Sequence, residues 1–367
     1  MGYTIADIAR QIGAQCAGDT DMIIARAAEP ADAGPDDLAM AMSPRYAGSL
    51  SDGSARAAML WDGADYRALG LRAAIFPARP RLAMARMTSM LDQGQGFDAG
   101  FGTGIHPSAL IDPSADIGED VTIGPMSIVG PRARIGAGSI IGPHCFIGMD
   151  ATLGEAGFLR EMVSIGARVT VGARFIAQPG ARLGGDGFSF VTPEVSGIER
   201  ARETLGDQGD IASQSYVRIH SLGAVRLGDD VEMGANATID NGTIRDTIIG
   251  NGCKFDNFAH IGHNVRMGND CLICGQVGVA GSTVVGNNVV LGGQTGVGDN
   301  LFIGDNVITG GATKVLANVP AGRVMLGYPA TKMDSQLEIY KSLRRLPRLL
   351  RDIAELKKAV FKSGDKH

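Results

Sequence analysis

The chain of 367 residues is poor in aromatic side chains, which make up only 5% of it and include a single tryptophan, Trp61. Aromatic side chains bury more surface than most others and dominate the packing of wide cores. Their scarcity therefore favours a narrow interior with little room for large rings. Glycine is abundant instead, with 53 residues, and the length is sufficient for two or three domains.

Long apolar runs and strong charge are also missing. No stretch approaches the 18 or so consecutive apolar residues of a transmembrane helix, and the N-terminus has no signal-peptide pattern, so we expect a soluble, cytoplasmic protein. The net charge of −5 is small, and no stripe of basic residues is interleaved with aromatics. Nucleic acid is therefore not an expected partner.

An aliphatic residue opens a block of six residues again and again from Ile105 onward, as in IDPSAD, IGEDVT and IGPMSI. The phase holds to Leu183, resumes at Leu227, slips by four residues after Ile239 and then runs unbroken from Ile249 to Val315. Repetition on this scale is typical of a solenoid, whose repeats stack on one another.

A period of six matches neither a helix nor a free strand, but it fits a short strand followed by a sharp turn. The first and fifth residues of each block then point inward, and Gly, Asn or Asp tolerates the turn. Three blocks close one triangular coil, which hydrogen-bonds to the next at a spacing of about 4.8 Å. About 29 blocks give roughly ten coils. We predict a mainly β fold with a parallel β-helix over residues 104–330.

The cysteines fit this interior. Cys145, Cys253 and Cys271 stand at the fifth, inward place of their blocks and are interpreted as small buried side chains. Cys271 and Cys274 form a C-x-x-C pair, but one of the two points inward and the context is not a thioredoxin-like unit. A redox function is therefore rejected.

The repeats have flanks and one interruption. Residues 1–103 predict a small α/β domain, with helices at 5–14 and 80–91 and strands at 57–61 and 73–76, followed by a linker at 93–104. A loop inserted at 188–216 is either part of a binding face or a surface excursion. Residues 331–367 predict a C-terminal helix from Met333 to Phe361, kinked at Pro347. Its basic side chains form either a solvated face or a docking surface for an acidic partner.

Candidate chemistry centres on His263, the third residue of its block, which should face outward at a corner. Asp256, outward in the preceding block, is a candidate to orient the ring so that His263 acts as a general base. His260 and His263 supply only two metal ligands, and the third histidine of a γ-carbonic anhydrase is not evident, so no metal is expected. Tyr46, in the loop Ser-Pro-Arg-Tyr, either stacks on a base or sugar or caps a small core.

Four segments resemble one enzyme family: GIHPSALIDPSADIG from Gly104, GGDGFSFV from Gly184, MGANATIDNGTIRDTIIGNG from Met233 and KFDNFAHIGHNVRMG from Lys254. The chain resembles the UDP-3-O-acylglucosamine N-acyltransferases of lipid A biosynthesis along its whole length. The related UDP-N-acetylglucosamine O-acyltransferases share the repeats but begin directly in the β-helix. The N-terminal segment that precedes the repeats therefore favours the N-acyl family.

The resemblance implies a left-handed β-helix and a homotrimer whose sites lie between neighbouring prisms. It implies a 3-hydroxyacyl donor carried on the phosphopantetheine arm of acyl carrier protein, no separate cofactor, and UDP-3-O-acylglucosamine as acceptor. His263 falls on the catalytic base, Asp256 on a supporting carboxylate, and Gly281 on the backbone donor of the oxyanion site. Tyr46 falls on an aromatic residue that packs against uracil, which makes 1–103 a uridine-binding domain. Asn257, Asn264 and His260 are further substrate-binding candidates.

The chain also departs from the family pattern. Met40 and Ser43 replace a frequent Phe and a frequent Asn near the uridine, and Asn300 replaces a second histidine. The loop from Phe188 to Ser215 is also longer than expected. A sugar with a 3-amino group is kept as a variant acceptor. The acyl chain length stays open, because the depth of a groove between subunits would set it. A coenzyme A-dependent sugar-nucleotide N-acetyltransferase and a non-catalytic β-helix scaffold are the alternatives.

Overall fold

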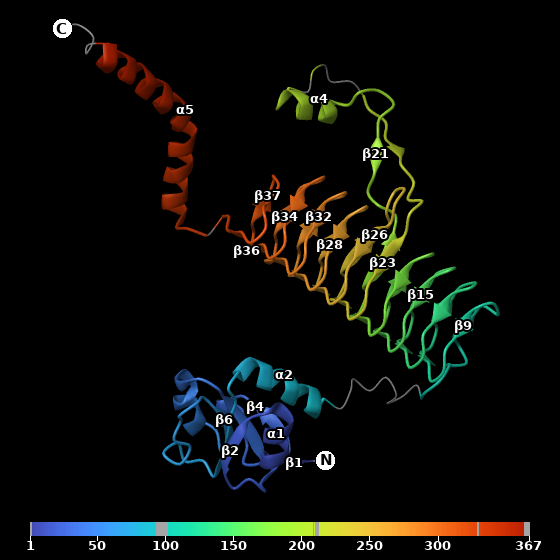
Figure 1. The fold of residues 1–367 in the computed structure, drawn as a ribbon, viewed down its shortest axis with the longest axis vertical. Helices are drawn as coiled ribbons and strands as arrows, with labels where there is room; N and C mark the ends of the chain where they lie inside the picture. Colours follow the sequence, from blue (N-terminus) through green and yellow to red (C-terminus); the bar gives the residue numbers. More distant parts are fainter. Residues whose placement is uncertain (1, 93–101, 208, 210–212, 329, 363–367) are drawn as a thin grey trace. The chain divides into compact units, whose positions relative to one another are not determined.

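The computed structural model describes residues 2–92, 102–207, 209, 213–328 and 330–362, so most of the linker predicted at 93–104 lies outside the described residues. The chain divides into two units, Met1–Gly100 and Phe101–His367. Figure 1 shows both, and each is described here by itself.

The first unit is a small α/β domain. Its five-stranded sheet has the order β2 (Gln15–Gly18), β7 (Ala73–Phe76), β6 (Ala57–Leu60), β5 (Asp37–Ala41), β4 (Arg26–Ala28). Only β2 is antiparallel to its neighbour in this sheet. The helices are α1 (Ile5–Ile12) and α2 (Pro80–Leu91), and β1 (Tyr3–Thr4) pairs with β3 (Ile23–Ile24). The predicted helices and strands are therefore present.

Helix α1 shows why these residues form a helix. The Thr4 hydroxyl accepts a hydrogen bond from the amide of Asp7 (3.1 Å), and the Asp7 carboxylate accepts one from the Thr4 amide, which satisfies the amides at the helix start. Gly13 ends the helix at φ 70°. Ile5, Ile8 and Ile12 lie on one buried face, against the sheet and α2.

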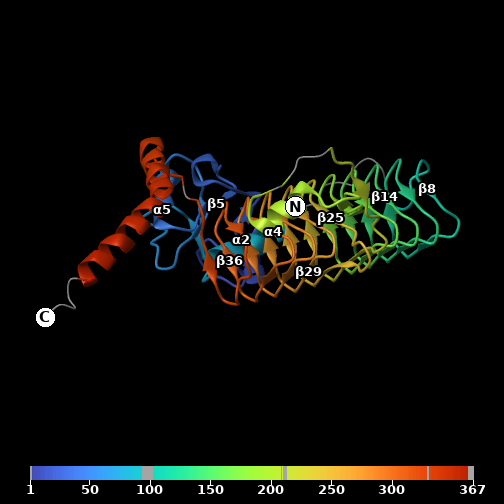
Figure 2. The same cartoon turned by 90° about the horizontal axis from the view of Figure 1, so that it is seen from above.

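The second unit contains a triangular parallel β-helix with three faces, coloured from green to red in Figures 1 and 2. The first face consists of β8 (Leu110–Ile111), β11 (Ile128–Val129), β14 (Phe146–Ile147), β17 (Ser164–Ile165), β20 (Arg182–Gly185), β25 (Thr238–Asp240), β28 (His260–Ile261), β31 (Gly278–Val279), β34 (Gly296–Val297) and β37 (Lys314–Val315). The second consists of β10 (Thr122–Ile123), β13 (Ile140–Ile141), β16 (Phe158–Leu159), β19 (Ile176–Ala177), β24 (Glu232–Met233), β27 (Lys254–Phe255), β30 (Leu272–Ile273), β33 (Val290–Leu291), β36 (Ile308–Thr309) and β38 (Val324–Met325). The third consists of β9 (Asp116–Ile117), β12 (Arg134–Ile135), β15 (Thr152–Leu153), β18 (Thr170–Val171), β23 (Val225–Leu227), β26 (Thr247–Ile249), β29 (Arg266–Met267), β32 (Val284–Val285) and β35 (Phe302–Ile303).

Strand register follows the sequence period. His260 pairs with Gly278, three blocks further along the chain, whereas the coil from Thr238 to its partner His260 is longer because it contains the slip. The first and fifth residues of the blocks form one continuous buried core, which includes Cys145, Cys253 and Cys271. Within the described residues the faces have ten, ten and nine strands, as the block count predicts. The predicted fold class is confirmed: mainly β, with a hexapeptide β-helix, an N-terminal α/β unit and a C-terminal helix.

The corners depart from one expectation. Gly, Asn or Asp was expected at the turn, yet residues such as His144, Arg168 and Phe258 adopt φ values of 57°, 64° and 60° there. Each of these amides donates to a carbonyl of the preceding coil, for example His144 to Pro125 at 3.0 Å and Arg168 to Met149 at 2.9 Å. The stacking hydrogen bonds therefore hold ordinary side chains in a left-handed conformation that costs them about 1 kcal/mol or more.

The insertion at 188–216 forms an arm that rises from the prism (Figure 1). A hairpin of β21 (Phe190–Val191) and β22 (Val217–Arg218) leads to helix α4 (Gly197–Thr204), which the sequence analysis did not predict. Ser196 and Glu199 cap its first turn reciprocally.

The C-terminal helix α5 (Met333–Lys362) has exposed side chains, and it changes direction along its length, as the internal Pro347 predicts (Figures 1 and 2). Within the described ranges, no helix is both long enough and apolar enough to cross a membrane.

The strained corners yield a stability prediction. Ala156 has φ 53°, so Ala156→Gly should stabilise the fold by up to about 1 kcal/mol, because relief of strain exceeds the added freedom of the unfolded chain. Ala137, which precedes a turn and has no positive φ, is the control: Ala137→Gly should destabilise by about 0.5–1 kcal/mol. Denaturant unfolding of both variants measures the difference. Equal destabilisation would show that the corner is unstrained.

Candidate functional site

His263 lies at the corner that joins the first and third faces, and its ring is held in one orientation. Nδ1 lies 2.9 Å from Oδ1 of Asn264. The same oxygen accepts the Thr243 amide at 3.0 Å, so this atom of Asn264 is an acceptor and Nδ1 of His263 must be the donor. Nε2 then carries no proton in the neutral ring. His263 is thus set up to accept a proton at Nε2.

Two glycines hold the imidazole between them. A Cβ added to Gly281 would lie 2.7 Å from Nε2 of His263, and one added to Gly187 would lie 2.7 Å from its Cβ. No larger residue fits at either place without moving the ring. Among the described residues, the amide of Gly281 donates to no acceptor, so it is available to a bound oxygen next to the base.

A groove of about 520 Å³ opens beside the base on the first face. Its floor runs through outward positions of successive strands, from His260 of β28 over Gly278 and Gly296 to Lys314 of β37. The two glycines leave backbone in place of side chains and so keep the floor low. Further lining residues are Phe188, Asp240, Gly262, His263, Val279, Ala280, Gly281, Val297, Gly298 and Leu316.

Asp240 is the groove residue that the sequence analysis missed. Its side chain is only 15% exposed, and Oδ2 lies 3.7 Å from Nε2 of His260. Burial raises the pKa of Asp240, although the nearby His260 and His263 act to lower it and Asp186 adds to the rise. The segment ATIDNGT contained a signal for this residue. Asp240 comes directly after Thr238 and Ile239, and Thr238 pairs with His260 of the next coil.

The structure does not bring Asp256 to His263 within one chain. Asp256 and Asn257 lie at the corner between the second and first faces, and strand β28 separates them from His263. The Asp256 carboxylate accepts the Asn257 amide at 2.7 Å, and Asn257 Oδ1 accepts the Ala235 amide at 2.7 Å. The expected orientation of the ring by Asp256 is therefore corrected for the single chain: Asn264 holds the ring.

The other histidine and asparagine candidates also have defined places. His260 lines the groove and its Nδ1 lies 2.9 Å from the Thr238 hydroxyl. Asn264 is only 6% exposed, and its side-chain oxygen is already shared by Thr243 and His263, so it supports the base from behind. Asn300 is exposed two coils beyond Asn264 and donates to Asp299 at 3.2 Å. The described residues contain no cluster of three or more potential metal ligands.

The chain is similar to known proteins along its whole length. A model of the bacterial transferase hexapeptide family (six repeats) matches residues 120–155 and 246–281. A protein of Ruegeria pomeroyi called UDP-3-O-acylglucosamine N-acyltransferase is 72% identical, with 99% of each chain covered. One of the same name from Paracoccus denitrificans is 57% identical, with 100% of this chain and 99% of its own covered.

The chain belongs to the UDP-3-O-acylglucosamine N-acyltransferase family. It is accordingly an acyltransferase. Among solved structures, the UDP-N-acetylglucosamine O-acyltransferase of Moraxella catarrhalis is similar, with a TM-score of 0.44, 28% identity, and 70% of this chain and 91% of that chain covered.

The N-terminal candidates of this family member differ in accessibility. Tyr46 is half-buried at the end of a short 3-10 helix (Pro44–Tyr46), and the guanidinium of Arg45 lies 4.6 Å from the centre of its ring. One face of the ring is thus covered by a cation. Ser43 is half-buried, whereas Met40 is only 9% exposed within β5 and is part of the core. Met40 therefore has little surface to offer a nucleotide.

Asp240 yields a prediction about stability and pH. Because burial raises the pKa of Asp240 in the folded state above the ordinary 3.8, the folded state holds this proton more tightly than the unfolded chain does. The group therefore costs stability as the pH rises above 3.8, and the cost grows until the pH passes the raised pKa of Asp240 in the folded state. Asp240→Asn should melt a few degrees higher than the wild type at neutral pH, and the gap should shrink towards pH 4 or so.

Asp256→Asn is the matched control, since this carboxylate is exposed and should leave the melting temperature unchanged. Thermal unfolding across the pH range measures both variants. A lower melting temperature for Asp240→Asn at neutral pH would mean that the charged carboxylate stabilises the fold through its histidine neighbours.

Proposed function

We propose that this chain transfers a 3-hydroxyacyl group from acyl carrier protein to the 2-amine of UDP-3-O-acylglucosamine, or of a 3-amino variant, in lipid A biosynthesis. The full-length identity to proteins of that name supports the choice of substrate. The observation that carries the chemistry is an imidazole whose Nε2 is free to take a proton, beside the Gly281 amide, at the end of a groove.

In the proposed reaction the sugar nitrogen attacks the thioester carbonyl, so that a C–N bond forms and the C–S bond breaks. Nε2 of His263 takes the proton that the nitrogen must lose, and the pantetheine sulfur leaves and is protonated to the thiol. The amide of Gly281 donates to the carbonyl oxygen while that oxygen carries negative charge. Asp240, when ionised, favours the imidazolium that forms on His263.

The groove offers a path for the donor. Its glycine floor between His260 and Lys314 suits the pantetheine arm and the acyl chain, which need length and apolar contact more than polar partners. Lys314 donates to the Gln294 carbonyl at 3.1 Å, and its side chain lies against Gly296. The charged side chain of Lys314 thus lies on the floor of the groove, one coil beyond Gly296.

We propose that the active unit is a homotrimer, as the family resemblance implies. Outward-facing apolar side chains support assembly, because they are costly to leave in water: Leu110, Phe146, Leu272, Phe302 and Ile308 are each between 44% and 66% exposed. In such a trimer the corner that carries Asp256 and Asn257 in one copy can meet the His263 corner of the next. The N-terminal unit would supply Tyr46 and Ser43 to the uridine.

The base assignment and the shared site can be tested together. His263→Ala should lower kcat by about 10²–10⁴-fold, since it removes the proton acceptor, and Asp256→Asn should cost less. Trimers assembled from both kinds of copy contain an interface in which His263 and Asp256 are both intact. Purified mixed trimers should therefore recover activity at about one site in three.

Each variant alone, at the same protein concentration, is the control for the mixed population, and light scattering checks that all are trimers. Recovery no greater than the average of the two pure variants would refute the shared site, because Asp256 and His263 do not meet within one chain. Single-turnover transfer that is normal in His263→Ala would refute the assignment of the base.

We propose that acyl carrier protein docks on helix α5. The exposed Arg344, Arg345 and Arg348 suit an acidic carrier protein, whose encounter would be steered by charge. Reversal of all three to Glu should raise the KM for acyl carrier protein about tenfold or more and leave the KM for the UDP-sugar unchanged, and the wild-type KM for the carrier should rise with salt. Steady-state kinetics measures this, with Asp334→Lys at the helix start as a control. An unchanged KM would exclude α5 as the docking site.

A further inference from the structure

The sulfur that leaves the donor has to take up a proton, and the groove holds a second imidazole that can supply it. His260 stands three residues before His263 in the chain, and its side chain is 49% exposed in the groove. It begins the glycine floor over which the donor is proposed to pass. The donor therefore passes both imidazoles.

The ring of His260 is held at one nitrogen and open at the other. Nδ1 lies 2.9 Å from the hydroxyl of Thr238, one coil earlier. Nε2 lies 3.7 Å from Oδ2 of Asp240, which is too far for a hydrogen bond but close enough for a protonated ring and an ionised carboxylate to attract each other. A Cβ added to Gly278, the next residue of this column, would meet no atom within 4 Å, so the space beside the ring is open to a ligand.

The two histidines differ in what their Nδ1 atoms contact. Asn264 offers His263 an oxygen that only accepts, so Nδ1 of that ring carries the proton and Nε2 is the acceptor. The hydroxyl of Thr238 accepts as well as donates, so it accommodates a His260 ring that is protonated on both nitrogens. Burial raises the pKa of Asp240, and His260 opposes this rise more strongly than His263 does. One ring is thus arranged to take a proton and the other to give one.

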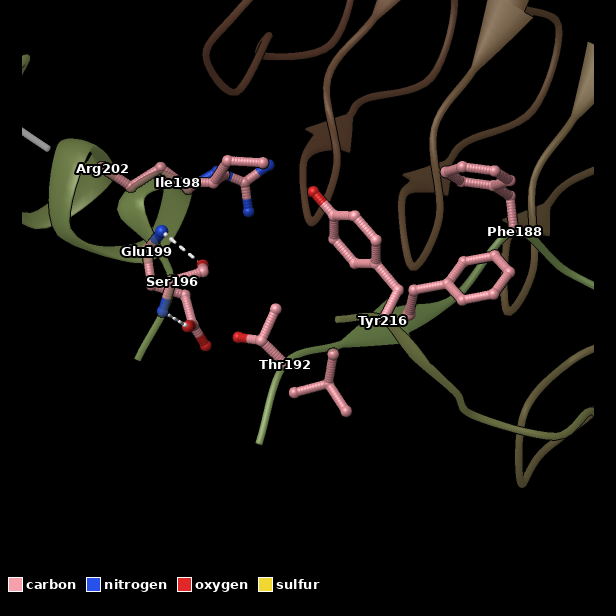
Figure 3. Close-up of a pocket in the computed structure, with 9 residues that line it drawn as sticks. Phe188, Thr192, Ser196, Ile198, Glu199, Arg202 and Tyr216 are labelled. Atoms are coloured by element: carbon pink, nitrogen blue, oxygen red, sulfur yellow. Dashed lines mark hydrogen bonds between the residues drawn. The ribbon is translucent and has the colours of Figure 1, made fainter. Parts of the chain in front are cut away.

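The rest of the groove offers no proton donor close to His263. Lys314 stands three coils beyond His260, and its Nζ donates to the Gln294 carbonyl at 3.1 Å. Phe188 also lines a cavity of the arm, at the end opposite to Arg202 in Figure 3. Apart from the glycines and the ionisable residues, the groove is lined by apolar side chains: Phe188, Val279, Ala280, Val297 and Leu316.

We propose that His260 is the general acid of the acyl transfer. This inference rests on the proposed function, in which His263 is the base. When the C–S bond breaks, its electron pair stays on the sulfur, and the sulfur takes the Nε2 proton of His260 and leaves as the thiol. The neutral His260 ring then regains a proton from water, while His263 returns to water the proton that it took from the sugar nitrogen. Protons therefore balance over one turnover.

The test compares two donors on acyl carrier protein that differ only in the leaving thiol. One carries the ordinary phosphopantetheine arm, and the other has fluorine atoms on the carbon next to the sulfur, which make the thiol more acidic. An acidic thiol leaves without the help of an acid. His260→Gln should therefore slow single-turnover transfer from the ordinary arm by about 10²-fold, and the fluorinated arm should restore most of this loss. In the wild type the two arms should react at similar rates.

His144→Gln is the matched control, because it makes the same change at an exposed histidine of the prism that does not line the groove. It should behave as the wild type with both donors. Thr238→Val keeps the His260 ring but removes the partner of Nδ1, so it should repeat the His260→Gln pattern to a smaller extent. This second variant decides the matter if His260→Gln does not fold.

An equal loss with both arms would overturn the inference, because a residue that only shapes the groove or positions His263 would slow both donors alike. No loss with either arm would overturn it as well. Wild-type protein that transfers the acyl group from neither arm would instead refute the proposed function.

Discussion

The stacking of one coil on the next is the constraint on which the rest of this structure depends. Main-chain hydrogen bonds join each strand to the strand three blocks further along the chain, and a one-residue shift would turn every inward side chain outward. The inward positions therefore accept a narrow set of aliphatic and small residues, including three cysteines. The same bonds hold the corners, where side chains as large as Phe258 and Arg168 keep a left-handed backbone.

This regularity also builds the site. A repeat lattice places outward residues in columns, so chemistry depends on which residue stands at each step of a column. At one corner the column brings His263 and Gly281 into contact, and on the adjoining face it brings His260, two glycines and Lys314 into line. The orientation of the His263 ring, in contrast, depends on a segment that does not follow the six-residue repeat. Asn264 is held by Thr243, in the segment that absorbs the four-residue slip, and its side-chain oxygen in turn fixes the ring.

The sequence was sufficient for the parts that repeat. A period of six with an aliphatic first residue predicts the coils, the buried cysteines and the outward position of His263, because each follows from the lattice alone. It was not sufficient where the chain leaves the lattice. Helix α4 is short and polar and has no buried residues, so its sequence shows no strong helical pattern of apolar residues. Asp240 was overlooked because only the stacking of one whole coil on the next brings it beside His260. Asp256 was paired with His263 on closeness in sequence, whereas a whole strand turns the chain between them.

The four-residue slip after Ile239 has a consequence for how such a chain changes over time. The four extra residues are accommodated at a corner, and strands β25 and β26 on either side of them keep their pairing with the next coil. The arm, inserted at the same edge of the prism, follows the same rule on a larger scale. Residues gained or lost inside a strand would instead exchange core and surface for all that follows. Length variation in this protein is thus confined to its edges, and the edge that received the arm is the one that holds the base.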